Sequence, residues 1–397
     1  MRPGNLLVLF GALNRPTMPA FSVLFTLEPL SRSIIVTVVP LMAFERFGTA
    51  QNVSIFFFVL GILGVGMSLA VPWIVSRYTR RGTFSIGVIT GVISMGLFMH
   101  GEVWSFCAGM ALHLFASSCI DVSLNLYMME HIRRQEFGRY EPVRMFFLAF
   151  SWCVGPFLGV YLRNTVNPAA PFVFGAITVT LLAAYFFYLR FTDNPAVTGA
   201  RPAVTNPMKY LPRFFIQPRL QLVYALSAMR SGWWTMYFIY VPIYCVTVGL
   251  GETTGGALVS LATAFVMTTP LLRGSIQRHG IRRILAVGYF GTGIMTIVLS
   301  LAMGVPRLAV GIILGAGLFA VLCDSVGNAL FYRAVHPYER SEMATVFGSY
   351  RSVSSLTFPG VYSGVLAVFQ LPAVFTVTGV GMIAASVLTR YIPKRMR

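Results

Sequence analysis

Charged residues are scarce in this sequence, and acidic residues are the scarcest. Only 11% of the 397 residues are charged, with 12 acids against 30 bases. Soluble domains carry about a quarter charged residues, so this composition excludes an ordinary soluble protein. The 56% of hydrophobic residues gather in runs of about 18 or more, each long enough to cross a bilayer. We therefore expect a polytopic membrane protein.

Motifs for metal, nucleotide or lipid chemistry are also missing. The five Cys residues form no CxxC pair, and no HExxH, HxxxxD or DDxxD string occurs. The Gly-rich stretch 311–320 lacks the Gly-Lys-Ser/Thr ending of a phosphate loop. We expect no metal, no cofactor and no enzyme activity. A lipid-modifying enzyme and a receptor without flux are the alternatives from other classes.

The net charge of +18 would suit a nucleic-acid-binding protein. The basic residues fall between apolar runs, however, and not in one patch. The expected partners are therefore membrane lipid, a small-molecule substrate and protons or another coupling ion, and no nucleic acid.

Apolar runs between polar or Pro/Gly-rich breaks predict twelve spans. The longest polar gap divides them six and six, as a linker would. This predicts an N-terminal segment (1–18), a six-helix bundle (19–192), a linker (193–219), a second six-helix bundle (220–392) and a tail (393–397). The predicted spans are 19–44, 52–76, 83–100, 104–129, 143–163, 171–192, 220–248, 255–272, 284–304, 308–332, 345–369 and 371–390.

The distribution of Lys and Arg predicts the orientation. Twenty-three of them lie in the termini, the linker and the loops on the same side, and three lie in the loops of the other side. Because basic residues collect on the cytoplasmic side, both termini and the linker are predicted to be cytoplasmic. We expect a monomer in the inner (plasma) membrane of a bacterium.

The two halves repeat each other in their polar residues. The first half places Asp121 and Asn125 four residues apart, and the second half does the same with Asp324 and Asn328. Arg144 and Arg351 follow at matching places, near the starts of spans 5 and 11. Parallel six-span repeats of this kind are typical of one large class of secondary transporter.

The loop after span 8 carries most of a known signature, roughly G-x-x-x-D-R-x-G-R-R. Gln277 stands where the acid is expected, while the fitting residues are Arg278, Gly280, Arg282 and Arg283. After span 2, Ser76 replaces the acid and Thr79 the Gly, while the fitting residues are Arg77, Arg80 and Arg81.

With the 6 + 6 topology and the central linker, these loops resemble the major facilitator superfamily. The resemblance implies an all-α integral membrane fold of two pseudo-symmetric six-helix bundles. It also implies that spans 1, 4, 7 and 10 line a central cavity. In that family the loop acid helps to lock the cytoplasmic side, so here the lock must rest on other charges.

Ionisable residues inside spans are costly and are therefore functional candidates. In span 1, Glu28 and Arg32 are neighbours on one helix face, so they form either an internal ion pair or a substrate or proton site. In span 7, Arg230 needs an anion, either the Glu28 carboxylate or a substrate. The aromatic residues that could wall a cavity beside Arg230, or only pack, are Trp233, Trp234 and Tyr237.

Asp121, Arg144, Asp324 and Arg351 are predicted to form a cytoplasmic gate. One alternative is pairing within each half, Asp121 with Arg144 and Asp324 with Arg351. The other is pairing across the halves, Asp121 with Arg351 and Asp324 with Arg144, which would break whenever the cytoplasmic side opens.

These residues predict a secondary active transporter that works by alternating access. The arginines at positions 32 and 230 indicate a small anionic or zwitterionic organic substrate. Glu28 is the preferred proton site, because apolar surroundings disfavour its ionised form. Proton-driven efflux of amphipathic compounds or drugs is the alternative function, favoured by an aromatic- and Met-rich interior.

Overall fold

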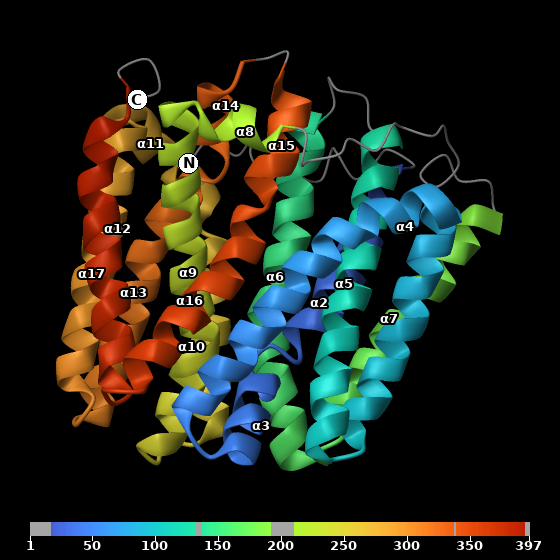
Figure 1. The fold of residues 1–397 in the computed structure, drawn as a ribbon, viewed down its shortest axis with the longest axis horizontal. Coiled ribbons are helices and arrows are strands. Elements are labelled where there is room, and N and C mark those ends of the chain that lie inside the picture. Colours follow the sequence, from blue (N-terminus) through green and yellow to red (C-terminus); the bar gives the residue numbers. More distant parts are fainter. Residues whose placement is uncertain (1–16, 132–136, 192–209, 337–338, 394–397) are drawn as a thin grey trace. The chain divides into compact units, whose positions relative to one another are not determined.

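The computed structural model describes residues 17–131, 137–191, 210–336 and 339–393. Within these ranges the secondary structure is helical, which confirms the predicted all-α architecture (Figure 1). The first half contains α2 (Thr17–Ser33), α3 (Val38–Phe47), α4 (Ala50–Met99), α5 (Val103–His131), α6 (Phe137–Thr165) and α7 (Ala170–Phe191). Parts of the predicted N-terminal segment, linker and tail (1–16, 193–209 and 394–397) lie outside the described residues.

The second half begins with the short helix α8 (Leu211–Phe215) and the long helix α9 (Pro218–Thr247). The helices that follow are α10 (Glu252–Val266), η2 (Thr269–Leu272), α11 (Arg273–His279), α12 (Ile281–Ala302), α13 (Pro306–Val326), α14 (Ala329–Ala334), α15 (Arg340–Gly348), α16 (Tyr350–Leu366), α17 (Pro372–Leu388) and η4 (Thr389–Tyr391).

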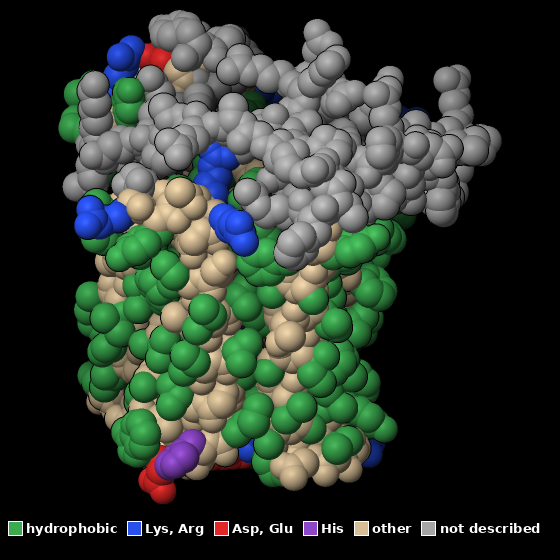
Figure 2. All heavy atoms as spheres, turned by 90° about the vertical axis from the view of Figure 1, so that its right-hand side faces the viewer, with side chains coloured by type: hydrophobic (Ala, Val, Ile, Leu, Met, Phe, Trp, Pro, Cys, Tyr) green, Lys and Arg blue, Asp and Glu red, His purple; other side chains and the backbone are tan. Residues whose placement is uncertain are grey.

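Nine candidate membrane spans occur in the described part of the chain. Helices α9, α10 and α16 occupy the other three spans that the sequence predicts. On the face drawn in Figure 2, hydrophobic side chains cover the middle, and the charged side chains in view lie toward its two ends. This distribution matches a surface in contact with lipid.

Two compact units make up the chain. Unit 1 comprises Met1–Val38 and Gly66–Val204, and unit 2 comprises Val39–Val65 and Thr205–Arg397. Unit 2 therefore includes α3 and the first part of α4, which precede the linker in sequence. The predicted bundle boundaries at residues 192 and 220 stay a prediction.

Span 1 is a broken helix, whereas the sequence predicts one continuous span at 19–44. Helix α2 ends at Ser33 and α3 begins at Val38. Pro40 explains the break, because its ring removes a helix hydrogen bond and clashes with the carbonyl four residues earlier. In unit 1 the break touches α6, where a Cβ on Gly159 would lie 1.8 Å from the Ile34 carbonyl oxygen.

Serine hydroxyls fix α2 to α6 in unit 1. The Ser33 hydroxyl donates to the Ser151 carbonyl at 2.8 Å, and the Ser151 hydroxyl donates to the Thr26 carbonyl at 2.9 Å. Lipid is as apolar as leucine, so such hydrogen bonds and close packing hold membrane helices together. They set the position of the ionisable residues on α2.

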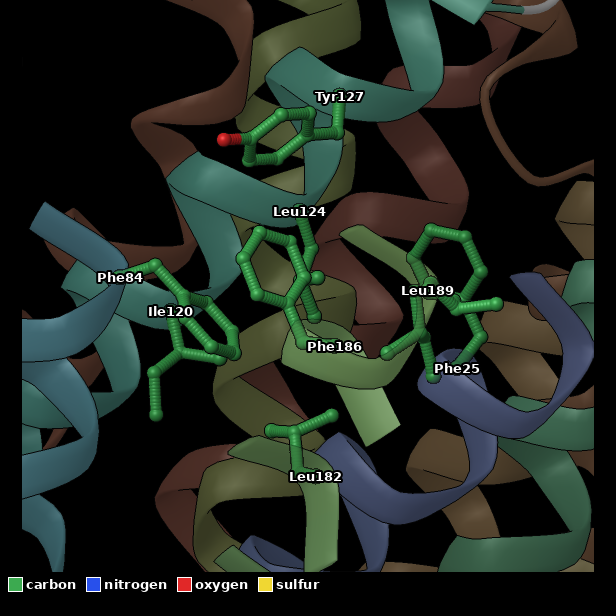
Figure 3. Close-up of a cluster of buried hydrophobic side chains, with 9 residues drawn as sticks. Phe25, Phe84, Ile120, Leu124, Tyr127, Leu182, Phe186 and Leu189 are labelled. Atoms are coloured by element: carbon green, nitrogen blue, oxygen red, sulfur yellow. The ribbon is translucent and has the colours of Figure 1, made fainter. Parts of the chain in front are cut away.

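Unit 1 has a buried hydrophobic cluster that joins α2, α4, α5 and α7 (Figure 3). The Phe186 ring lies 4.1 Å from that of Phe84 and 5.2 Å from that of Tyr127, measured between centroids. Ile120 and Leu124 belong to the same cluster, on either side of Asp121. The cluster therefore fixes the part of α5 that carries the intramembrane acid.

In unit 2, α12 packs along both α13 and α17, and α9 packs against α10 and α16 (Figure 1). Buried hydroxyls connect these helices, as where Tyr289 of α12 donates to the Leu226 carbonyl of α9 at 2.6 Å. The first part of α4 joins the unit through Ser54, whose hydroxyl lies 2.5 Å from that of Tyr240. These contacts hold α9 and α13, the helices that carry the charged residues.

A glycine contact is repeated in the two units. In unit 1, a Cβ on Gly87 of α4 would lie 2.8 Å from the Ile120 side chain. In unit 2, a Cβ on Gly288 of α12 would lie 2.7 Å from the Cys323 sulfur. Each contacted residue directly precedes the intramembrane acid of its half, so both units bring the acid-bearing helix into close contact with the preceding span.

Candidate functional site

An acid–arginine pair joins α9 and α13 in unit 2. The Arg230 Nε lies 3.5 Å from Oδ1 of Asp324, and the Trp234 indole N–H donates to Oδ2 at 2.9 Å. The side chains of Arg230 and Asp324 are 12% and 18% exposed. Because an arginine in such surroundings keeps its charge, it needs an anionic partner. Asp324 supplies that charge, whereas the sequence suggests Glu28 as the internal partner.

The acid-bearing helix α13 ends at Val326, two residues after Asp324. Gly327 has φ 50° and ψ −131°, a conformation open to glycine, and its N–H donates to the Asp324 carbonyl at 2.9 Å. The chain then restarts as α14, with Asn328 at its N-cap. The end leaves main-chain carbonyls without helical partners, and Arg230 Nη1 donates to one of them, the Cys323 carbonyl, at 3.4 Å.

Tyr350, at the start of α16, joins two guanidinium groups in unit 2. Its hydroxyl oxygen accepts from Arg230 Nη2 at 3.4 Å and from Arg351 Nε at 3.3 Å. The Arg351 guanidinium also lies 5.8 Å from the centroid of the Tyr350 ring. The Arg230 side chain is 12% exposed, Tyr350 is buried and Arg351 is exposed, so the cluster runs from a largely buried cation to an exposed one.

A second acid–arginine pair lies within unit 1, on α2. Arg32 contacts both carboxylate oxygens of Glu28, with Nε 2.8 Å from Oε1 and Nη2 3.1 Å from Oε2. The Glu28 side chain is 5% exposed and that of Arg32 29%. Pro29, inside the same helix, removes one main-chain hydrogen bond beside the pair. The predicted neighbours on one helix face therefore form a two-point ion pair.

Asp121 on α5 is bonded to an amide. The Asn125 side-chain N–H donates to its Oδ1 at 3.0 Å. Asp121 also lies within electrostatic range of Glu28 and Arg32. Arg144 on α6 lies over the Phe25 ring, 5.6 Å from its centroid. Unit 1 thus collects two acids and two arginines around α2.

The gate pairing within each half does not occur among the described residues. Asp324 pairs with Arg230, and Arg351 is bonded to the Tyr350 hydroxyl. Asp121 accepts from Asn125 and makes no ion pair with Arg144. The pairing across the halves stays a prediction.

Trp233 and Tyr237 occupy the interior of unit 2, as the packing alternative expects, and their part in a cavity wall stays a prediction. Trp233 donates to the Thr296 hydroxyl at 3.0 Å, Tyr237 donates to the Leu258 carbonyl at 3.3 Å, and both are 1% exposed. Their polar atoms are satisfied by neighbouring helices, so they pack. Trp234 is half-buried, and its ring stacks on Phe238 with centroids 5.4 Å apart.

The two signature-like loops share one backbone conformation. Thr79 has φ 63° and ψ 169°, and Gly280 has φ 78° and ψ 153°. A positive φ is strained for a β-branched residue. The Thr79 hydroxyl compensates in part, because it accepts from the Gly82 N–H at 3.4 Å. The glycine position of the signature thus keeps its geometry where threonine replaces glycine.

The other residues of these loops that fit the signature are arginines. Arg81 lies over the Phe187 ring, 5.5 Å from its centroid. Arg77, Arg278 and Arg283 are exposed, and Arg80 and Arg282 are half-buried.

Among the described residues no group of three His, Cys, Asp or Glu is placed to hold a metal ion.

Sequence reasoning missed Tyr350 and the end of α13 at Gly327. Both carried a signal: Tyr350 directly precedes an intramembrane arginine, and Gly327 stands between the repeated acid and asparagine. A glycine at that place favours a helix end, and a tyrosine hydroxyl beside an arginine favours a hydrogen-bonded cluster.

Comparison with known proteins gives the family of the chain. The model of the Major Facilitator Superfamily matches residues 21–359. No curated protein shows a significant match. The fold is similar to that of a POT family transporter in complex with 5-aminolevulinic acid, with TM-score 0.77 and 12% identity over 96% of both chains.

Two other solved structures share the fold. The peptide transporter POT in complex with sulfate has TM-score 0.73 and 12% identity, over 96% of this chain and 94% of that one. A D-xylose–proton symporter has TM-score 0.68 and 13% identity, over 96% of this chain and 97% of that one. At these identities the likeness establishes the fold.

Proposed function

Because this multi-pass membrane chain belongs to the Major Facilitator Superfamily, we propose that it is a proton-coupled secondary transporter for small anionic or zwitterionic organic solutes. It works by alternating access, as a monomer in a bacterial inner membrane with both termini cytoplasmic. The observation that carries the substrate class is Arg230, a buried cation held by three long contacts of 3.4–3.5 Å.

Arg230 can form stronger hydrogen bonds with a substrate anion than with its present partners. A strong charge-assisted hydrogen bond measures about 2.7–2.9 Å, so the Arg230 contacts are weak ones. Asp324 instead accepts a short hydrogen bond of 2.9 Å from the Trp234 indole N–H. A substrate carboxylate that reaches Arg230 would therefore replace its weak contacts with strong charge-assisted hydrogen bonds. This gain is the basis of selective binding in an apolar site.

The Glu28–Arg32 pair supports proton coupling. A hydrogen bond of 3.1 Å and a second N···O contact of 2.8 Å pair the two charges while Glu28 is ionised. Protonation removes the negative charge and releases the Arg32 guanidinium, so one proton changes the charge of unit 1 by one. A solved structure of the same fold is that of a D-xylose–proton symporter. Glu28 is accordingly the proposed proton site, and Asp121 and Asp324 are the second choices.

Efflux of amphipathic compounds is the second candidate function. One observation favours it, the half-buried stack of Trp234 on Phe238 beside Arg230, because exposed aromatic faces suit varied apolar groups. The burial of Trp233 and Tyr237 removes two of the aromatic residues on which this function would rely.

Flux in proteoliposomes tests the proposal. The purified protein is given 5-aminolevulinic acid, short peptides and D-xylose, with and without an inward proton gradient. We expect gradient-driven uptake of a zwitterionic solute and no uptake of the neutral sugar. In Arg230→Ala the uptake should fall at least about 30-fold, because removing one partner of a buried charge contact costs about 2 kcal/mol or more. Uptake of D-xylose alone, or uptake unchanged in Arg230→Ala, would refute the substrate class. Export against the gradient would favour efflux.

A further inference from the structure

Resting on the proposed function, we infer that Arg230, Tyr350 and Arg351 form a receptor for a substrate carboxylate. Two guanidinium groups approach one neutral phenol oxygen, at 3.4 and 3.3 Å. Guanidinium N–H groups seek anionic oxygens, and a phenol oxygen is a weak substitute for one. The arrangement is therefore that of a preformed site for an oxyanion.

The charges of this cluster do not balance. Arg230 and Arg351 contribute two positive charges, and Asp324 contributes one negative charge. Both oxygens of Asp324 are engaged, by Arg230 and Trp234. Among the described residues Arg351 pairs with no acid. One added negative charge would neutralise the cluster, so a monoanionic carboxylate fits it better than a dianion such as phosphate.

Tyr350 adds a neutral donor to the two cations. Its oxygen accepts from both arginines, which leaves its hydrogen to be donated. Within the described part of the chain, no acceptor takes this hydrogen, although Tyr350 is only 4% exposed. We expect a substrate oxygen to accept this hydrogen, because buried hydroxyls are normally satisfied. Three donors then converge on one carboxylate.

Exposure assigns an order to the three groups. Arg351 is exposed, Tyr350 is buried, and the Arg230 side chain is 12% exposed. A carboxylate would meet Arg351 first and then pass to Arg230, with Tyr350 bonded to both. Tyr350 is thus a specificity-determining residue, because it holds both guanidinium groups toward one point.

Binding measurements on the purified full-length protein test the receptor. The probes are 5-aminolevulinic acid, its methyl ester and inorganic phosphate, at constant ionic strength. We expect saturable binding of the acid, and binding at least about tenfold weaker for the ester, which lacks the carboxylate charge. Phosphate is expected to bind more weakly than the acid. Failure of the acid to bind saturably, or equal binding of the ester, would overturn the inference. Phosphate binding tighter than the acid would overturn the monoanion assignment.

Variants locate the binding. Arg351→Gln and Tyr350→Phe should each weaken binding of 5-aminolevulinic acid about tenfold, through loss of one charge-assisted contact or of the bridge. Arg351→Lys should fall between, because it keeps the charge and loses the fork. Arg390→Gln, an exposed arginine in η4, is the matched control and should bind as wild type. Wild-type affinity in both Arg351→Gln and Arg351→Lys would refute the receptor, even if Tyr350→Phe did not fold.

The same variants separate this inference from the proposed function. Binding that depends on Arg351 and Tyr350, with no flux of any solute in proteoliposomes, would leave the receptor standing and overturn transport. Flux with binding unaffected by these substitutions would leave transport standing and overturn the receptor.

Discussion

Asp121 and Asp324 occupy matching places in the two halves, yet they have different partners. Both lie beside a close contact with a glycine of the preceding span, Gly87 in unit 1 and Gly288 in unit 2. Asp121 accepts one hydrogen bond, from an amide one helical turn away. Asp324 instead faces a guanidinium and an indole N–H from α9. The same spacing of acid and asparagine thus accompanies a hydrogen bond to an amide in unit 1 and an ion pair in unit 2.

The backbone after each acid explains the difference. In unit 1 the position three residues on is Leu124, 2% exposed in the hydrophobic cluster, and α5 continues through Asn125. In unit 2 it is Gly327, and the helix ends. The end places Asn328 at the N-cap of α14 and frees carbonyls, one of which Arg230 binds. The residue three positions after the acid, leucine in unit 1 and glycine in unit 2, therefore decides whether the acid pairs within its own helix or with a residue of another helix.

The largest contrast is expected between Asp324→Asn and Asp121→Asn. The first leaves Arg230 buried without a carboxylate, which should lower the free energy of unfolding by about 3–5 kcal/mol. The second replaces an acceptor of one amide hydrogen bond and should cost about 1 kcal/mol or less. Thermal unfolding of the two purified variants, side by side, measures the difference. Equal destabilisation would mean that both acids carry equivalent interactions.

Gly327→Ala sharpens the comparison at the helix end. With φ 50° and ψ −131°, an added Cβ is strained, and we expect a loss of about 1–3 kcal/mol in stability together with weaker solute binding. Gly315→Ala is the matched control in the same helix, because a Cβ there meets only Met295 at an ordinary 3.7 Å. The control should be neutral or slightly stabilising. If Gly327→Ala behaved like the control, the helix end would not depend on glycine.

The smallest effect is expected at the strained threonine. Thr79→Gly relieves a positive φ and loses a hydroxyl that caps the following helix, so stability should change by no more than about 1 kcal/mol. Gly280→Ala only adds strain at the matching position and should destabilise by about 1–2 kcal/mol. Thermal unfolding again measures both. Equal losses in the two variants would show that the two loops are not equivalent.

The helices could be predicted from sequence because lipid imposes one rule on every span, namely a long apolar run with its backbone bonded internally. The repeated acids and the Glu28–Arg32 pair followed from local spacing. The pairing of Arg230 with Asp324 did not, because it depends on how α9 and α13 meet. The break between Ser33 and Val38 was also missed, although Pro40 marks it, since hydropathy ignores backbone geometry.

The surroundings of the aromatic residues of α9 could not be predicted from the sequence either. Trp233, Trp234 and Tyr237 look alike in sequence, and all follow an intramembrane arginine. Their helix positions point two of them into unit 2 and leave Trp234 half-buried beside Asp324. Composition alone therefore does not tell which of these aromatic residues pack and which stay accessible.

We propose that the two acid–arginine pairs have separate roles, in which Glu28 binds the proton and Arg230 binds the substrate. This proposal is tested by comparing gradient-driven uptake with solute exchange for one transported solute. Glu28→Gln should keep exchange and lose gradient-driven accumulation, because the neutral amide cannot release a proton, whereas Arg230→Ala should lose both. Accumulation against the gradient in Glu28→Gln, or exchange at the wild-type rate in Arg230→Ala, would contradict the account.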